Sequence, residues 1–289
     1  MGLIGQTCYP RTMSSPQPRK LTLADIPQSL ALSTLAGWNQ AAADWSLMLE
    51  LEPQHCWGIE VDGVLAATTT LICYERRLAW IGMVLTHPEF RRRGFARQLV
   101  EHALLTAKDL RIPTVKLDAT EQGQPLYESL GFRAEQPIER WSIEKPKSAN
   151  WKEEIPIQGT KSLDRSMLDL DGQVFGANRA RALQALAKLS AHFQNDAAYL
   201  LARAGREKYY LGPCIAKNAD AAQNMIQQAV AKFPNVSWFW DLFPKNFEAV
   251  AIAQHLGFKK QRSLLRMVLG PDFPTRSGQI FAIAGFELG

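Results

Sequence analysis

Several features that mark common protein classes are missing from this chain of 289 residues. The four cysteines form no C-x-x-C pair and the five histidines no H-E-x-x-H spacing, so we expect reduced thiols and no metal site. No apolar run is long enough to span a bilayer, and the N-terminus lacks the apolar core of a signal peptide. We therefore expect a cytoplasmic protein with no membrane partner.

Residues 1–20 hold basic residues, serine and proline but no acidic residue. This composition predicts a flexible N-terminal tail, with a transit peptide as the alternative, and it leaves open whether the first 12–20 residues belong to the mature protein.

Charge is also modest, at a formal net value of +5. Such a balance favours anionic ligands but lies far below that of a dedicated nucleic-acid-binding protein, so we expect no nucleic-acid partner. The composition, 46% hydrophobic and 21% charged, is that of a globular protein long enough for two domains.

The sequence does contain a repeated order of predicted helices and strands. Helical spacing over 21–51 is followed by three strands with a turn at Asp62-Gly63, and then by helix, strand, helix and strand. The second half starts with a predicted helix over 179–191 and repeats strand, helix, strand, helix, strand up to about residue 270. The tripeptide Leu-Gly-Phe recurs at 130–132 and 256–258, which indicates an ancestral duplication.

Charged residues interrupted by proline and glycine separate the two copies. We therefore expect a tail over 1–20, a first domain over 21–147, a linker over 148–162 and a second domain over 163–289.

The stretch FRRRGFARQL, from Phe90 to Leu99, places three adjacent arginines and a glycine between a predicted buried strand and a predicted helix. The start of a helix offers unbonded N–H groups and a positive dipole, and Gly94 lets an anion approach the backbone. This arrangement suits a pyrophosphate. The complete glycine patterns of nucleoside triphosphatases and of Rossmann turns are absent, and a solvated basic loop is the alternative for this stretch alone.

Two motifs in order make the chain resemble the GNAT superfamily of N-acetyltransferases. That family's main motif, Arg/Gln-x-x-Gly-x-Gly/Ala between a strand and a helix, is matched by Arg91, Gly94 and Ala96. Its second motif, Asn-x-x-Ala-x-x-Leu-Tyr-x-x-x-Gly-Phe, is matched about 30 residues later in TEQGQPLYESLGF, where Thr120 and Gly123 replace the asparagine and the alanine.

The resemblance implies an α/β (α+β) fold of tandem GNAT-like domains, each with a mixed, largely antiparallel central sheet flanked by helices. It also implies acetyl-CoA as acyl donor, with no metal. Backbone amides of the arginine loop would hold the pyrophosphate, and two strands, WIGMVL and TVKLDA, would splay apart for the pantetheine arm. The implied cofactor-binding residues are Met83, Val84, Leu85, Arg91, Arg92, Arg93, Gly94, Phe95, Ala96, Arg97 and Thr120.

The resemblance further implies direct acyl transfer to an amine, with Tyr127 as general acid and the amide near Val84 or Leu85 for the oxyanion. A phenol is suited to that role because it is protonated at neutral pH, although a half-buried aromatic is the alternative for Tyr127. The general base stays open among Asp118, Glu75 and His87. We take Asp118 as the candidate.

The segment GWNQAAADW lies where the superfamily usually places its acceptor-binding helices. Trp38, Asp44 and Trp45 are therefore candidate substrate residues, and a core position for both tryptophans is the alternative.

The second copy lacks both the loop and the acid. Residues 217–220 contain neither glycine nor arginine, Asp220 would repel a phosphate, and Ala253 takes the place of the tyrosine. We predict that this degenerate copy binds no acetyl-CoA and instead shapes the acceptor pocket.

Together these features predict an acetyl-CoA-dependent N-acetyltransferase acting on a primary amine of a small molecule or peptide, as a monomer or homodimer. A non-catalytic acyl-CoA-binding sensor is the alternative. The sequence does not identify the acceptor.

Overall fold

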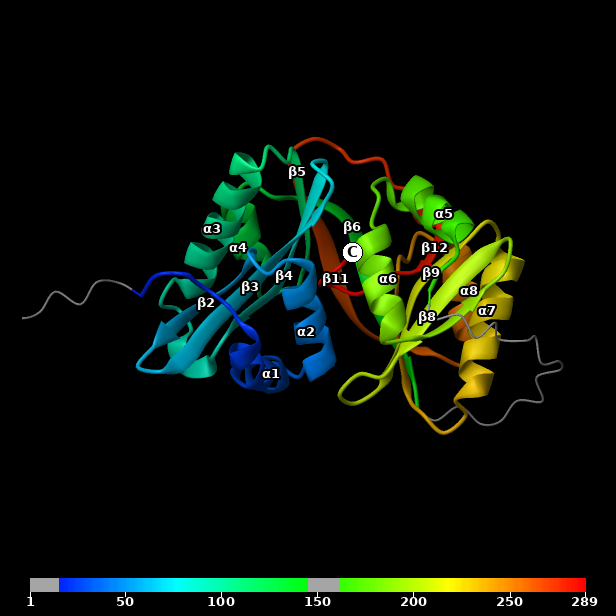
Figure 1. Cartoon of the computed structure of the whole chain (residues 1–289). Helices are drawn as coiled ribbons and strands as arrows, with labels where there is room; N and C mark the ends of the chain where they lie inside the picture. Colours follow the sequence, from blue (N-terminus) through cyan, green and yellow to red (C-terminus); the bar gives the residue numbers. More distant parts are fainter. Residues whose placement is uncertain (1–15, 145–161) are drawn as a thin grey trace, which may run out of the picture.

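The computed structural model describes residues 16–144 and 162–289. The predicted linker, except Ser162, and residues 1–15 of the predicted N-terminal tail therefore lie outside the described residues. The end of that predicted flexible tail, Arg19–Lys20, is instead a short strand in the sheet. Within the described part, twelve strands form one continuous mixed sheet with helices on both faces (Figure 1). The predicted class, a mixed and largely antiparallel sheet flanked by helices, is confirmed.

The first half follows the predicted order of elements, and the turn at Asp62-Gly63 joins two antiparallel strands as expected. Its helices are α1 (Ile26–Leu35), α2 (Ala42–Leu51), α3 (Phe95–Asp109) and α4 (Gln124–Ser129), with short 3-10 turns η1 (Leu23–Asp25) and η2 (Pro88–Phe90). Its strands are β1 (Arg19–Lys20), β2 (Cys56–Val61), β3 (Val64–Tyr74), β4 (Leu78–Thr86), β5 (Thr114–Ala119) and β6 (Arg133–Ile143).

The second half also keeps the predicted order, with two differences at its start. A helix that the sequence reading missed, α5 (Arg165–Phe175), precedes the expected one, and the expected one ends early because a strand begins at Ala191. The helices are α5, α6 (Ala180–Lys188), α7 (Ala219–Lys232) and α8 (Phe247–His255), with a 3-10 turn η3 (Ser277–Gln279). The strands are β7 (Ala191–Gln194), β8 (Ala198–Arg203), β9 (Tyr209–Ala216), β10 (Trp238–Leu242), β11 (Lys259–Leu269) and β12 (Ile280–Ala282).

The two halves exchange one strand each. The order β1-β2-β3-β4-β5-β11-β6-β10-β9-β8-β7 places β11, from the second half, between β5 and β6 of the first. In the same way β6, from the first half, lies between β10 and β11 of the second. Each half therefore completes the sheet of the other, and the two predicted domains share one sheet.

Two buried ion pairs mark this exchange. Arg266 on β11 faces Asp118 on β5, with Nε–Oδ1 and Nη2–Oδ2 distances of 2.8 and 3.0 Å. Arg140 on β6 faces Asp241 on β10 in the same way, at 2.8 and 2.7 Å. Both arginines lie eight residues beyond the phenylalanine of a Leu-Gly-Phe tripeptide, so the pairs are equivalent in the two copies.

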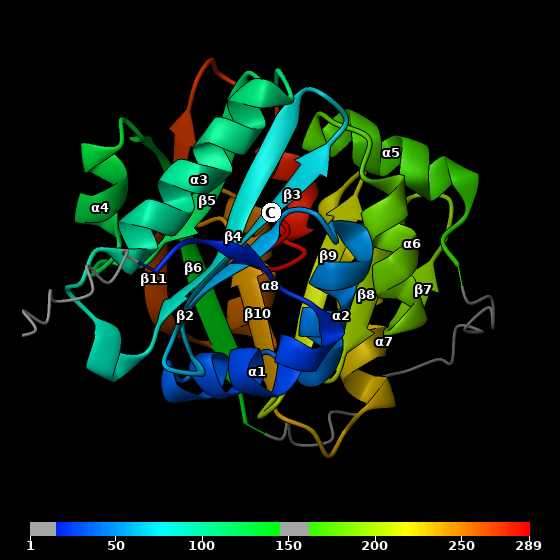
Figure 2. The same cartoon turned by 60° about the vertical axis from the view of Figure 1, so that its left-hand side comes forward.

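The helices form three layers around this sheet. Helices α3 and α4 cover the outer face of the first half and α7 and α8 that of the second (Figures 1 and 2). Helices α1, α2, α5 and α6 contribute to the central core that joins the halves. The C-terminus lies at the centre of the molecule, between the halves (Figures 1 and 2).

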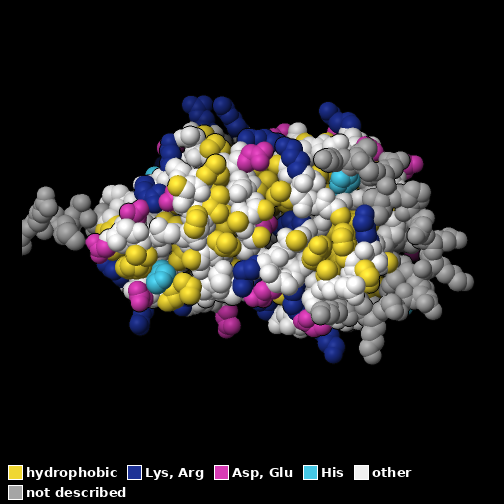
Figure 3. All heavy atoms as spheres, turned by 60° about the horizontal axis from the view of Figure 1, so that its bottom comes forward, with side chains coloured by type: hydrophobic (Ala, Val, Ile, Leu, Met, Phe, Trp, Pro, Cys, Tyr) yellow, Lys and Arg dark blue, Asp and Glu magenta, His cyan; other side chains and the backbone are white. Residues whose placement is uncertain are grey.

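The surface carries charges of both signs. On the face seen in Figure 3, lysine and arginine side chains are interspersed with acidic and hydrophobic ones. Across residues 16–144 and 162–289, the helices are too short or too polar for any of them to cross a bilayer.

Candidate active site

A cleft of about 870 Å³ runs from the arginine loop, past β4 and β5, to the junction with the second half. Every predicted cofactor-binding residue except Arg93 lines it, and so do Tyr127, Asp118 and Trp38. Arg93 instead places its guanidinium over the rings of Phe90 and Phe95, 5.3 Å from each centroid.

The arginine loop presents its backbone to this cleft. Arg92 and Gly94 both have positive φ, and Gly94 is the residue that caps α3. A Cβ added at Gly94 would meet no atom within 4 Å, so this side of the loop is open. Among the described residues, no hydrogen-bond acceptor is recorded for the amides of residues 92–97. Unbonded amides at a helix start, beside exposed arginines, suit an anionic group such as a pyrophosphate.

Helix α3 holds this loop in place. Its buried side is formed by Phe95, Leu99, Val100, Ala103 and Ala107, which recur at helical spacing and pack on the sheet. This packing fixes the helix, and the residues of its first turn line the cleft.

Strands β4 and β5 diverge beside the loop. They pair in parallel only from Leu78–Thr114 to Trp80–Lys116, and the remainder of each strand has no partner in the other. The pairing of β3 with β4 is irregular at this point, with a register shift between Thr68 and Thr70. Met83, on β4 at this irregularity, has a φ of 50°. The divergence leaves the slot that the sequence reading expected for the pantetheine arm.

Tyr127 lies on α4 at the edge of this slot. Among the described residues its hydroxyl has no hydrogen-bond partner, and burial raises its pKa well above the ordinary value, so the phenol stays protonated. Thr120, which replaces the asparagine of the motif, accepts a hydrogen bond from the amide of Gly123 and so helps to begin this helix.

Asp118 borders the cleft, but its carboxylate points away into the sheet. The side chain is 0% exposed and both of its oxygens accept hydrogen bonds from Arg266. Because Arg266 holds both oxygens, the pairing disfavours Asp118 as the general base, and that role stays a prediction. Glu75 and His87, the other two candidates, do not line the cleft.

Of the three candidate substrate residues, only one lies at the cleft. Trp38 lines the cleft, whereas Trp45 is 1% exposed and packs in the central core, where its indole N–H donates to Ser33. Asp44 is buried in an ion pair with Arg203. The alternative of a core position therefore describes Trp45 and not Trp38.

Glu121 and Glu287 also line the cleft, and the sequence analysis named neither as a candidate. Glu287 is the one that comes from the second half of the chain. It lies in the C-terminal segment, against β4: a Cβ added at Gly82 would be 2.9 Å from its Cα. The indole N–H of Trp80 holds the same segment by donating to the carbonyl of Phe286 at 2.9 Å. Glu287 thus lies beside the bulge at Met83, across the boundary between the two halves.

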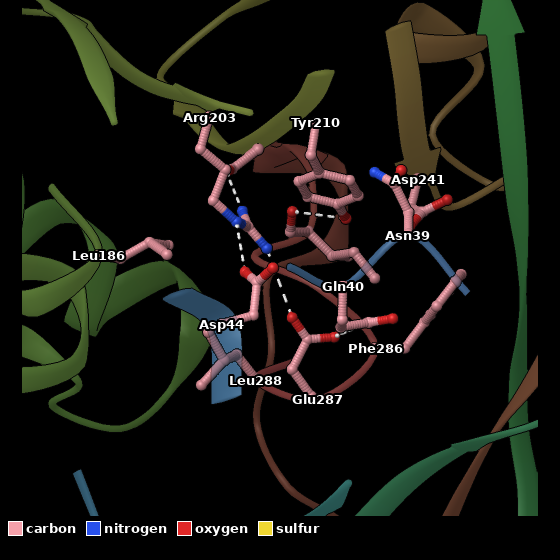
Figure 4. Close-up of polar contacts among 12 residues, drawn as sticks. Asn39, Gln40, Asp44, Leu186, Arg203, Tyr210, Asp241, Phe286, Glu287 and Leu288 are labelled. Carbon is pink, nitrogen blue, oxygen red and sulfur yellow. Dashed lines mark hydrogen bonds and ion pairs between the residues drawn. The ribbon is translucent and has the colours of Figure 1, made fainter. Parts of the chain in front are cut away.

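Two other parts of the chain, around residues 40–44 and at Arg203, surround this carboxylate (Figure 4). Arg203, on β8, reaches both Asp44 on α2, at 3.2 Å, and Glu287, at 3.4 Å. Gln40 donates a hydrogen bond to Glu287 at 3.2 Å. Burial raises the pKa of Glu287; Arg203 opposes that shift and the Asp44 carboxylate adds to it. Glu287 is buried and both of its oxygens are held, as in Asp118, but at 3.2–3.4 Å instead of 2.8–3.0 Å, so it is the more weakly held candidate for a general base.

The equivalent slot in the second half is filled by the chain itself. Strands β9 and β10 also pair only three times before they diverge, and β12 then pairs with β9 through Ile280 and Ala282. The indole of Trp240 donates to the carbonyl of Phe281 at 2.7 Å, which fastens the segment in place.

The helix start beside this second slot is also occupied. The side chain of Asn218 accepts a hydrogen bond from the amide of Ala221 at 2.9 Å, so one N–H group at the start of α7 already has a partner. Asp220, in the first turn, adds a negative charge there that disfavours an anion.

One group of possible metal ligands lies outside the cleft, in the described part of the chain. Glu52, His55 and Cys73 place a ligand atom each within 4.8 Å of the others. Their contacts include a 2.9 Å hydrogen bond between His55 and Glu52, and burial raises the pKa of the Cys73 thiol to about 12. The expectation of no metal site stays a prediction.

Both halves of the chain match known sequence families. Residues 24–132 match the model of the "Acetyltransferase (GNAT) family", and residues 167–282 match that of the "Acetyltransferase (GNAT) domain". The uncharacterised N-acetyltransferase YitH of Bacillus subtilis is 27% identical over 221 residues, which are 73% of this chain and 77% of that protein. A protein of Schizosaccharomyces pombe, C11D3.02c, is 33% identical over 87 residues, or 29% of this chain and 58% of its own length.

Solved structures share the fold over most of the chain. A protein of Pyrococcus horikoshii assigned as an acetyltransferase has a TM-score of 0.84 at 18% identity, with each chain covered completely. A tandem GNAT protein from the clavulanic acid biosynthesis pathway has a TM-score of 0.61 at 13% identity, over 89% of this chain and all of that one. A GCN5-related N-acetyltransferase of Sphaerobacter thermophilus has a TM-score of 0.63 at 15% identity, over 90% and 98% of the two chains.

Proposed function

Because this chain belongs to the GNAT acetyltransferase family in both of its halves, and is therefore an acyltransferase, we propose that it transfers an acetyl group from acetyl-CoA to a primary amine at the cleft of its first half. The observation that carries this proposal is the open arginine loop beside the slot between β4 and β5. There the arginine loop, apart from Arg93, and the bulged edge at Met83 line one continuous cleft.

In this proposal the loop amides and Arg91, Arg92 and Arg97 face the pyrophosphate of acetyl-CoA, and Met83 to Leu85 lie along its pantetheine arm. Arg93 supports the loop by packing on Phe90 and Phe95. When bound, acetyl-CoA supplies an acetyl group already activated as a thioester.

The chain's own residues divide the proton transfers. Glu287 takes a proton from the acceptor's ammonium group, so that a neutral amine attacks the carbonyl carbon. The amide near Val84 or Leu85 donates a hydrogen bond to the carbonyl oxygen as its charge grows, and Tyr127 gives its proton to the departing sulfur. The new amide nitrogen then loses its second proton, which restores the phenol of Tyr127. The base thus comes from the second half and the acid from the first.

We propose further that the second half binds no acetyl-CoA. Strand β12 lies in the slot where a pantetheine arm would pair, and α7 lacks an open, arginine-bearing start. That half keeps the fold and supplies the C-terminal segment that carries Glu287.

Calorimetric titration with acetyl-CoA tests this proposal. We expect one site per chain, and we expect the double variant Arg92→Glu, Gly94→Asp to lose it, because charge reversal and a side chain both enter the loop. Two sites would contradict the assignment of the second half, and no binding would refute the proposed function. One site without turnover of any amine would instead support a non-catalytic acyl-CoA sensor.

A further inference from the structure

The part of the cleft at the junction of the two halves carries a charge that the mechanism above does not use. We call this region the acceptor end, and its residues come from both halves: Trp38, Gln40, Arg140, Arg262, Leu264, Phe286 and Glu287. Two of these side chains are explained, since Glu287 is the proposed base and Arg140 is neutralised by Asp241. Arg262 is not.

Arg262 lies on β11 directly opposite Arg140 on β6, beside a register shift in that ladder. Its side chain is partly buried and its Nε is shielded from solvent with no hydrogen-bond partner. Across residues 16–144 and 162–289 no ion pair is recorded for it, not even with Glu287 of the same cleft. Its guanidinium lies 5.8 Å from the centre of the Phe286 ring.

The buried arginines in the described part of the chain differ from Arg262 because each of them has a carboxylate partner. Each donates to a carboxylate, in the pairs Arg140–Asp241, Arg179–Asp171, Arg203–Asp44 and Arg266–Asp118. A guanidinium partly withdrawn from water without such a partner is costly; the positive charge of Arg140 adds to the cost and the Asp241 carboxylate offsets part of it. A bound anion in the cleft would provide the missing partner.

The charges at the acceptor end are therefore of two kinds. Glu287 and Asp44 share Arg203, which leaves one negative charge in excess for an ammonium group. Arg262 leaves one positive charge in excess for an anion. A carboxylate carries one negative charge and matches the fork of a guanidinium, whereas a phosphate monoester carries about −1.5 to −2 and would leave charge unbalanced.

We propose, on the basis of the function above, that the acceptor is a free amino acid, whose amino group faces Glu287 and whose carboxylate binds Arg262. The acyl group then forms an amide on that amine, and the carboxylate stays unreacted on Arg262 as the positioning contact. The second half of the chain contributes both groups that select the acceptor.

The test compares free amino acids with analogues that keep the amine and lose the carboxylate. The wild-type protein is assayed for CoA release with the twenty standard amino acids, with their α-carboxamides, and with taurine and O-phosphoethanolamine as other anionic amines. We expect at least one free acid to be acetylated, with kcat/KM about tenfold or more above that of its carboxamide.

Arg262→Gln should remove this preference: kcat/KM for the acid falls about tenfold or more, while the value for the carboxamide changes less than about threefold. Arg76→Gln is the matched control, because Arg76 is exposed in the turn between β3 and β4 and does not line the cleft. Acetyl-CoA titration and the thermal midpoint of each variant show that the fold and the donor site are intact.

The outcomes separate this inference from the proposed function. If carboxamides are acetylated as well as acids, if Arg262→Gln leaves the preference unchanged, or if O-phosphoethanolamine is the best acceptor, the amino-acid assignment is wrong and the acetyltransferase function stands. If acetyl-CoA binds and the only amines that react are polyamines or other amines without an anionic group, the amino-acid assignment is likewise wrong and the acetyltransferase function stands. If acetyl-CoA does not bind, or no amine reacts, both proposals fail.

Discussion

Tyr127 is a buried residue at the edge of the cleft, and its hydroxyl bonds to no group among the described residues, so removal of the hydroxyl isolates its chemical role. Tyr127→Phe should lower kcat about 10²- to 10⁴-fold, because the departing thiolate loses its proton donor. Acetyl-CoA affinity and the free energy of unfolding should stay close to wild type. Steady-state assays and calorimetry check this, and an unchanged kcat would exclude Tyr127 as the acid.

Glu287 allows a prediction about pH. Burial raises its pKa above the ordinary value for a glutamate, and a base accepts a proton only when it is ionised. The rate should therefore fall as the pH drops through this raised pKa. Glu287→Gln should lower kcat about 10²- to 10⁴-fold and remove this limb of the pH profile, while the limb set by the acceptor's own ammonium group remains.

The control for Glu287 is Glu248→Gln, because Glu248 is exposed on α8 and lies outside the cleft. Its pH profile should match that of the wild type. A Glu287→Gln variant that keeps the limb at the lower pKa, besides the one set by the acceptor's ammonium group, would show that another group is the base.

The two acidic residues show what local sequence can and cannot predict about the site. The arginine loop and Tyr127 were predicted because each belongs to a short motif whose geometry is fixed by neighbours in the chain. The pairing of Asp118 could not be predicted, because its partner Arg266 lies 148 residues away and nothing near Asp118 in the sequence reveals the pair. Glu287 was missed for the same reason, since only the fold carries the C-terminus to β4.

At the scale of elements, the contact between β4 and the C-terminal segment depends on one missing side chain. Gly82 packs against the backbone of Glu287, and a Cβ there would be 2.9 Å from the Cα of that residue. Gly82→Ala should push the segment away, lower kcat about tenfold or more, and cost about 1–3 kcal/mol in the free energy of unfolding. Acetyl-CoA affinity should change little, because the loop amides are elsewhere.

Gly278→Ala is the matched control, since a Cβ at Gly278 would meet no atom within 4 Å and its backbone has no positive φ. Activity assays and urea denaturation of both variants check the prediction. Equal activity in the two would mean that the position of the C-terminal segment does not matter for the reaction.

Elements with strong periodicity were predicted well, and the weaker ones were not. Helix α3 and the strands around it follow from their apolar spacing and from the turn at Asp62-Gly63. Helix α5 was missed because RSMLDLDGQVF contains a glycine and two aspartates, which disfavour a helix locally. Its formation depends on burying Met167, Val174 and Phe175 in the core shared by the two halves.

For the molecule as a whole, the duplication was predictable and the exchange of strands was not. Repeated tripeptides and a repeated order of elements lie along the chain, whereas the choice between β6 and β11 as the neighbour of β5 is a long-range pairing. The exchange explains how a half without an acetyl-CoA slot can still take part in the reaction. It fixes the second half, and with it Glu287 and Arg262, against the cleft of the first.

This architecture predicts that the two halves unfold together. Arg266→Ala removes the partner of Asp118 and leaves a buried carboxylate uncompensated, which should lower the free energy of unfolding by about 3–5 kcal/mol. Adding Asp118→Ala should cost much less than a second independent loss, because the unpaired charge is then gone. Urea denaturation followed by tryptophan fluorescence and by far-UV circular dichroism should give one transition with coincident midpoints. Two separate transitions, with only one shifted by Arg266→Ala, would mean that each half is stable without the strand it receives.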